Sequence, residues 1–139
     1  MGTDIFSNIN WLSVLAAAAA YFFLGAIWYS FLFKDAWIRH SGVNVNDPNM
    51  KKGVAQTMMA SFVLMFVASL GIVILLANIP NSDWKTGAKL GLLTGVCFSF
   101  TGISISYLYE KRPLALHLIN GGYNICGCIV AGIVLAIWN

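Results

Sequence analysis

Charged residues are scarce in this chain of 139 residues: only 9% are Asp, Glu, Lys or Arg, against roughly 25% in soluble globular domains. Hydrophobic residues make up 59% of the chain, more than a soluble domain of this length could bury. The eight Lys and Arg residues are too sparse to form a nucleic-acid surface. The composition therefore excludes a soluble domain and a nucleic-acid-binding protein, and it predicts a protein whose solvent is the lipid bilayer.

Cysteine is also scarce, and an odd count of three, Cys97, Cys126 and Cys128, argues against a disulfide framework. Cys126 and Cys128 are two apart, so on a helix they point in different directions and do not suit a shared metal. The chain also lacks a Ser-His-Asp set, an HExxH motif, a P-loop and paired intramembrane carboxylates. The sequence therefore predicts no catalytic residue, no bound metal and no cofactor.

Four stretches contain no charged residue at all, at 11–33, 54–79, 90–109 and 114–138. Each is about as long as the roughly 20 residues that a membrane-spanning helix requires. Helix is the expected structure because lipid offers no hydrogen-bond partners to an open backbone. The sequence predicts an all-α fold, a single transmembrane domain over residues 1–139, with four helices at about 11–40, 48–79, 83–109 and 113–138.

Turn-forming residues set these boundaries. Gly42 suits the end of the first helix, and Asp47 followed by Pro48 is typical of a helix start. Pro80 ends the second helix. Pro113 opens the fourth helix after a very short turn, so the last two helices should form an antiparallel hairpin.

The distribution of basic residues predicts the orientation in the membrane. Two loops on one side hold most of them, Lys34, Arg39, Lys51, Lys52, Lys111 and Arg112, whereas the other side has only Lys85 and Lys89. Interfacial aromatic residues agree with this division: Trp11, Trp84 and Trp138 mark one boundary, and Trp28, Tyr29, Trp37, Tyr107 and Tyr109 mark the other. Because basic loops stay in the cytoplasm, both termini should be non-cytoplasmic.

Small residues recur at helical spacing along the third helix, at Gly87, Gly91, Gly95, Ser99 and Gly102. Such a stripe lets another membrane helix approach closely. Two interpretations are open: a contact with another helix of the same chain, or an interface with another subunit. Either one predicts that the stripe does not face lipid.

Polar side chains follow one face of the fourth helix, at His117, Asn120 and Asn124. Tyr123 lies on an adjacent side at similar depth, and Tyr21 of the first helix reaches a comparable depth. Amides and phenols in a membrane need partners in protein or water. One interpretation is hydrogen bonding between helices; the other is a polar cavity for a small solute or ion. His117 is also a weaker candidate for proton handling.

Two blocks of sequence resemble the bacterial family of proteins of unknown function DUF1761. Residues 10–15 (NWLSVL) and 25–30 (GAIWYS) resemble the family's first-helix block, with Lys34 and Trp37 after it. Residues 110–114 (EKRPL), 118–120 (LIN) and 122–123 (GY) resemble its second block. The resemblance implies four membrane helices in a bacterial envelope, and it implies no activity.

These observations lead to an expected function of oligomeric permeation or transport of a small solute or ion along the polar face of the fourth helix. An alternative is a non-catalytic accessory or assembly subunit that docks partner helices through the glycine stripe. A small membrane enzyme ranks last because no catalytic group is evident. The expected partners are the lipid bilayer and either copies of the same chain or another membrane protein, and the expected location is a bacterial cytoplasmic membrane.

Overall fold

The computed structural model describes residues 9–42 and 53–138, and within these residues every regular element is a helix. The first span consists of α1 (Trp11–Ile27) and a π-helical turn, η1 (Trp28–Leu32), and α2 (Lys34–Ser41) follows it. The second span is α3 (Val54–Ala77). The third consists of α4 (Trp84–Thr94), the π-helical segment η2 (Gly95–Phe100) and α5 (Thr101–Tyr109), and the fourth is α6 (Leu114–Trp138).

Four of these helical segments are long and apolar enough to cross a membrane: Trp11–Leu32, Val54–Ala77, Trp84–Tyr109 and Leu114–Trp138. The predicted all-α class and the four membrane helices are thus confirmed, and the chain is a multi-pass membrane protein.

Hydrogen bonds to capping side chains define where two of the helices begin. The side chain of Asn10 accepts from the Leu12 amide at 3.1 Å, and Asp83 accepts from the Thr86 amide at 3.0 Å. The hydrogen bonds from the Thr86 amide and the Thr86 hydroxyl hold the pKa of the Asp83 carboxyl below its usual value.

The first helix differs from its predicted form. It was expected to run unbroken to about residue 40, but Phe33 leaves the helical conformation and separates η1 from α2. Gly42, which follows α2, has φ of 77°, a left-handed conformation that glycine adopts readily. The predicted start of the second helix at Asp47 and Pro48 lies outside the described residues, and α3 begins at Val54.

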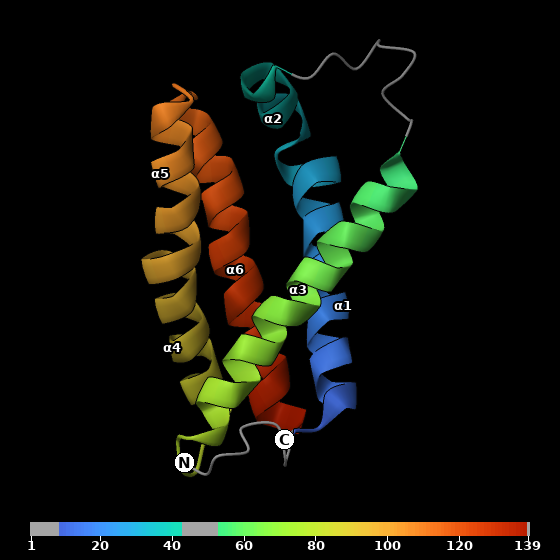
Figure 1. Ribbon diagram of the computed structural model, residues 1–139, viewed down its shortest axis with the longest axis vertical. Helices are drawn as coiled ribbons and strands as arrows, with labels where there is room; N and C mark the ends of the chain where they lie inside the picture. The colour runs from blue at the N-terminus through green and yellow to red at the C-terminus, as the bar shows by residue number, and fades with distance from the viewer. Residues whose placement is uncertain (1–8, 43–52, 139) are drawn as a thin grey trace.

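The helix α6 is the centre of the molecule, and α1, α3 and α4 all pack on it (Figure 1). Figure 1 also shows α4, η2 and α5 forming one rod beside α6, while α3 crosses obliquely in front of α1 and α6. The N-terminal half of α3 leans away from α5, so the ribbons of these two helices are farther apart at the α2 end than at the end where α4 begins.

The glycine stripe of the third span lies against α6. A β-carbon built on Gly87 would lie 2.1 Å from the Gly132 oxygen, and one on Gly91 would lie 2.3 Å from the Cys128 oxygen. One on Gly95 would lie 2.7 Å from the Ile125 Cα. Ser99 continues this contact, with its Oγ 3.9 Å from the Cys128 Sγ. The three glycines therefore let the backbones of α4 and α6 touch within one chain.

Gly102 does not belong to this contact, contrary to expectation. It is exposed, and nothing lies within 4 Å of a β-carbon built there. The reason is η2, because a π-turn inserts an extra residue into the helix, and one residue turns the following side chains by about 100°. The same change of register brings Phe100 onto α6, where its ring would lie 2.2 Å from a β-carbon at Gly121.

Candidate functional site

Two asparagines of α6 bind three tyrosines from the other spans. Tyr29 Oη donates to Asn120 Oδ1 at 2.6 Å, and Asn120 Nδ2 donates to Tyr107 Oη at 2.8 Å. Tyr21 Oη donates to Asn124 Oδ1, the pairing expected from their depths. Asn124 Nδ2 donates to the backbone oxygen of Asn120 at 2.8 Å. The network thus joins the first and third spans through α6.

This network lies deep in the membrane. Asn124 is ten residues after Leu114, which begins α6, so it lies about 15 Å along the helix at 1.5 Å per residue. That is close to the middle of a hydrocarbon core roughly 30 Å thick. Hydrogen-bonding groups at this depth have no water to replace a missing partner, so the partners described above decide how stable the site is.

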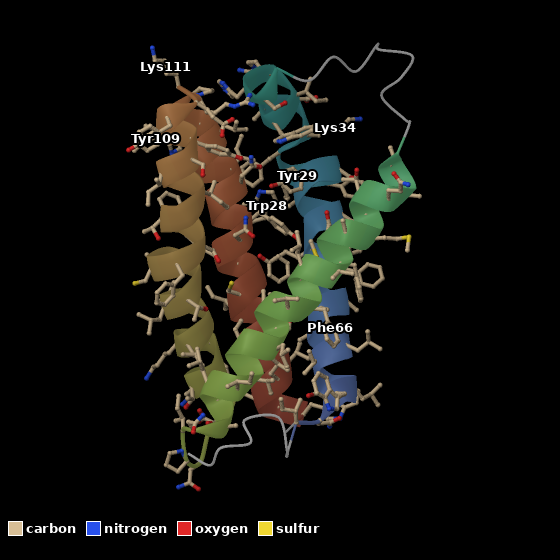
Figure 2. All side chains as sticks on the ribbon, viewed as in Figure 1. Trp28, Tyr29, Lys34, Phe66, Tyr109 and Lys111 are labelled. Atoms are coloured by element: carbon tan, nitrogen blue, oxygen red, sulfur yellow. The ribbon has the colours of Figure 1, made fainter. Side chains whose placement is uncertain are left out.

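Tyr123 is the centre of an aromatic cluster that surrounds the network. Its ring meets those of Tyr21 and Tyr29 edge to face, each at 5.3 Å between centroids. Its Oη donates to the backbone oxygen of Tyr21 at 3.0 Å. Trp28 lies on another side of Tyr123 and donates its Nε1 hydrogen to the Ile119 oxygen at 3.0 Å. Figure 2 shows Trp28 and Tyr29 between η1 and α6.

Two glycines make room for these rings. A β-carbon on Gly25 would lie 2.8 Å from the Tyr123 Oη, and one on Gly127 would lie 2.5 Å from the Tyr21 ring. Any larger residue at either position would displace a tyrosine from the network. The sequence therefore provides both the phenols and the space that they occupy.

A cavity of about 600 Å³ lies beside the network, between the first span, α3, α5 and α6. It is comparable in size with known small-molecule sites, which are about 300–1,000 Å³. Its walls are mostly apolar, with Phe22, Met58, Met65 and Ile103 among them. Its polar groups are Tyr29, Ser30, Thr57, Ser61, Tyr107, Asn120, Tyr123 and Asn124. A smaller cavity of about 250 Å³ lies beside Tyr21, Ser61 and Asn124.

Several hydrogen-bond donors on the cavity wall have no acceptor among the described residues. Each asparagine amide has two N–H groups, and Asn120 and Asn124 each use one of them. Tyr107 accepts a hydrogen bond, but its own O–H donates none. The hydroxyls of Ser30, Thr57 and Ser61 form no hydrogen bond within the described part of the chain. The wall can therefore donate to a molecule that carries acceptor atoms.

No side chain described as lining this cavity carries a charge. Among the described residues there is also no group of three His, Cys, Asp or Glu that could hold a metal ion. His117 is buried, and its ring packs edge to face on Tyr107 at 5.3 Å. His117 thus packs against a residue of the cavity wall, Tyr107, and is not itself part of the lining. The arrangement suits hydrogen bonding to an uncharged molecule and offers little for acid–base chemistry.

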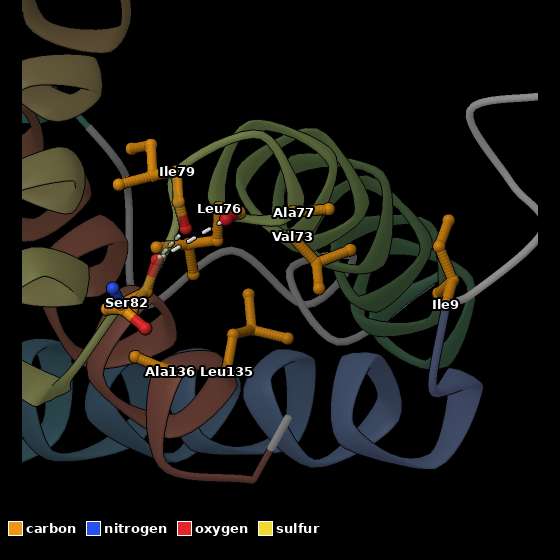
Figure 3. Close-up of a pocket in the computed structure, with 9 residues that line it drawn as sticks. Ile9, Val73, Leu76, Ala77, Ile79, Ser82, Leu135 and Ala136 are labelled. Atoms are coloured by element: carbon orange, nitrogen blue, oxygen red, sulfur yellow. Dashed lines mark hydrogen bonds between the residues drawn. The ribbon is translucent and has the colours of Figure 1, made fainter. Parts of the chain in front are cut away.

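A third cavity, of about 390 Å³, lies at the opposite end of the bundle. Figure 3 shows it between the C-terminal ends of α3 and α6, with Val73, Leu76 and Leu135 along its sides. Ser82 Oγ donates to the Ile79 oxygen at 2.7 Å, which completes the turn between α3 and α4. The hydroxyl of Ser82 is thus satisfied by the backbone, and Asn81 is the other polar side chain described in the lining, so this cavity has fewer donors than the one beside the network.

The sequence predicted Tyr21, Asn120, Tyr123 and Asn124 for this face, and the structure brings all four together. Tyr29 and Tyr107 were interpreted as interfacial aromatics, yet both lie in the network. The position of Tyr29 could have been predicted from the sequence, because Tyr29 follows Tyr21 by eight residues and so shares its helix face. The position of Tyr107 could not have been predicted in this way, because η2 changes the helix face on which Tyr107 lies.

The two blocks of sequence that resemble a known family meet at this site. Trp28, Tyr29 and Ser30 come from the first block, and Asn120 and Tyr123 come from the second. A model of the family described as "Protein of unknown function (DUF1761)" matches residues 12–136. No curated protein and no solved structure matches the chain.

Proposed function

The chain belongs to this family of proteins of unknown function, DUF1761, and from its own site we propose that it binds a small uncharged molecule inside the membrane, as the binding step of transport. One observation carries the proposal: donors of Tyr107, Asn120 and Asn124 point to a cavity and have no acceptor in the described chain. These three side chains are only partly buried by the protein, but lipid at this depth offers a donor no partner, and an unmet hydrogen-bonding group there costs about 1–3 kcal/mol. A ligand that accepts from these groups would recover that free energy.

The chemistry of the lining favours one class of ligand. An anion or cation in this cavity would meet no opposite charge, and burying an unpaired ion is far more costly than burying a neutral polar group. Carbonyl, ether or hydroxyl oxygens can instead accept from the amides and phenol. The expectation from the sequence, a small solute or ion, is therefore narrowed to an uncharged, oxygen-bearing molecule.

The alternative function, docking of a partner through the glycine stripe, is less well supported by this geometry. Gly87, Gly91 and Gly95 already contact α6 of the same chain at backbone distance, which leaves no room for another helix there. A homo-oligomer remains part of the proposal for a different reason: four helices form a thin wall around a transport path. We also place the protein in a bacterial cytoplasmic membrane, which rests on the sequence resemblance.

The melting temperature of the purified protein in lipid nanodiscs, followed by tryptophan fluorescence, tests the proposal. The uncharged probes are glycerol, erythritol and 1-monodecanoylglycerol, and decanoate is the charged counterpart of the last. We expect an uncharged probe to raise the melting temperature and decanoate to have no effect. At ten times its Kd, a ligand adds about 1.4 kcal/mol to the free energy of unfolding.

Two neighbouring tyrosines supply the matched control. Tyr107→Phe removes a cavity donor, whereas Tyr109→Phe removes a phenol that is 87% exposed and outside the cavity. The shift caused by the probe should shrink in Tyr107→Phe and in Asn120→Leu, and it should persist in Tyr109→Phe. Equal shifts in all these variants, or no shift with any uncharged probe, would rule out this cavity as the binding site.

A further inference from the structure

The cavity has an opening between α3 and α5. Thr57, Met58 and Ser61 line one edge from α3, and Ile103 and Tyr107 line the other from α5. In the described structure α3 packs on α1, α4 and α6, and its N-terminal half leans away from α5 (Figure 1). Among the described residues α3 packs far less closely on α5 than on these three helices, although residues of both line the cavity, so we take the cavity to reach the side of the bundle between them.

This opening lies at membrane depth. Ser61 is seven residues after Val54 and Ile103 is six residues before Tyr109, so both lie roughly 10 Å inside the ends of their helices at 1.5 Å per residue. Large apolar side chains are exposed on both helices, with Met58 of α3 52% exposed and Leu108 of α5 70% exposed, although Thr57 beside Met58 is exposed as well. A molecule entering from the side therefore comes through hydrocarbon and not through water.

From these observations we infer that the ligand is an amphiphile taken directly from the bilayer, with an uncharged oxygen-bearing head and a flexible apolar tail. The head would accept from Tyr107 and Asn120, and the tail would leave between α3 and α5 past Met58 and Ile103. Methionine suits such a position because its unbranched, polarisable side chain adapts to flexible apolar groups. This inference rests on the proposed function, since it assigns a ligand class and an entry route to the same cavity.

Photolabelling in nanodiscs tests the inference. The probe is a monoacylglycerol with a diazirine in its acyl chain, and the labelled positions are mapped by mass spectrometry after irradiation. We expect labelling of Met58, Met65 or Ile103 that an excess of unlabelled monoacylglycerol reduces at least five-fold. Labelling that is no stronger there than at Val63, which faces outward on the same helix, would overturn the inference.

Variants at the edge of the cavity test whether this opening is needed for labelling. Ser61→Trp should obstruct the opening and reduce labelling, whereas Val63→Trp adds the same ring outside the cavity and should leave labelling unchanged. Ile103→Trp obstructs the opening from the other edge, so the test survives if Ser61→Trp fails to fold. Equal labelling of wild type and a folded obstructed variant would overturn the lateral route.

The two proposals fail in different ways. If glycerol or erythritol raises the melting temperature through Asn120 while the acyl probe does not label the opening, the cavity binds a water-soluble molecule. The proposed function then stands and the lateral route is wrong. If no probe depends on Asn120, both proposals are wrong.

Discussion

At the scale of residues, the polar network pairs side chains that would each be energetically unfavourable in the membrane without a hydrogen-bond partner. Asn124 and Tyr21 are the clearest pair, because the phenol of one donates to the amide oxygen of the other across two helices. Removing one partner leaves the other side chain without a hydrogen bond, and no water is present at this depth to replace it. Removing both leaves little that needs a hydrogen bond.

A double-mutant cycle should show this coupling. We expect Tyr21→Phe and Asn124→Leu each to lower stability, and the double variant to lose less than the sum of the two. The coupling should be about 0.6 kcal/mol, and up to roughly 1.7 kcal/mol, as for hydrogen bonds within other membrane proteins. Reversible unfolding in mixed micelles measures it. Additive losses would show that the two side chains do not share a hydrogen bond that matters for stability.

The same cycle separates a structural role from a functional one. If these polar groups serve only packing, stability and cellular phenotype should change together across the variants. If they serve the cavity, the double variant should lose function far more than its small loss of stability explains, because polar groups kept for activity are often not optimal for stability.

At the scale of elements, the contact between α4 and α6 and the segment η2 divide the third span into two parts with different surroundings. From Gly87 to Gly95, the first residue of η2, the backbone of the third span touches α6. After η2, Gly102 is exposed and Tyr107 reaches the network. The π-helical segment η2 thus ends the close contact with α6 and places the phenol of Tyr107 at the cavity.

Substitution of two glycines on this span by alanine should have opposite effects. Gly91→Ala forces a methyl group against the α6 backbone, and we expect a loss at the upper end of the roughly 1–3 kcal/mol typical of overpacking. Gly102→Ala meets nothing within 4 Å and should be neutral or mildly stabilising, since alanine favours helix over glycine. Melting temperatures in the same detergent provide the comparison. Similar losses at both positions would contradict the described contact.

Sequence patterns predicted what depends on hydropathy and spacing along a regular helix. The four spans, the shared depth of Tyr21 and Asn124, and the close fit of Gly87 and Gly91 all follow from such patterns. The two π-segments and the break at Phe33 could not be predicted, because they depend on which side chains fit between packed helices. The errors at Gly102 and Tyr107 follow from assuming a straight helix, whereas Tyr29 was missed although its spacing from Tyr21 placed it on the right face.

At the scale of the whole molecule, the charged residues and the cavity lie in a fixed relation to each other. Lys34 and Lys111 lie at the same end of the bundle (Figure 2), the end toward which α3 and α5 separate. Arg112 Nη1 donates to the Ser41 oxygen at 3.2 Å, which ties α2 to the turn before α6. The orientation of the protein therefore decides which leaflet the cavity opens into.

The last prediction is that the end with Lys34 and Lys111 faces the cytoplasm. Four basic residues described at that end, Lys34, Arg39, Lys111 and Arg112, outnumber Lys85 and Lys89 at the other, and basic residues near span ends are retained on the cytoplasmic side. Alkaline phosphatase, active only outside the cytoplasm, should be active when fused after Asn139 and inactive when fused after Arg112. Green fluorescent protein should show the opposite pattern. Reversed signals at both fusion points would invert the protein and move the opening of the cavity, with any amphiphile that enters it, to the outer leaflet.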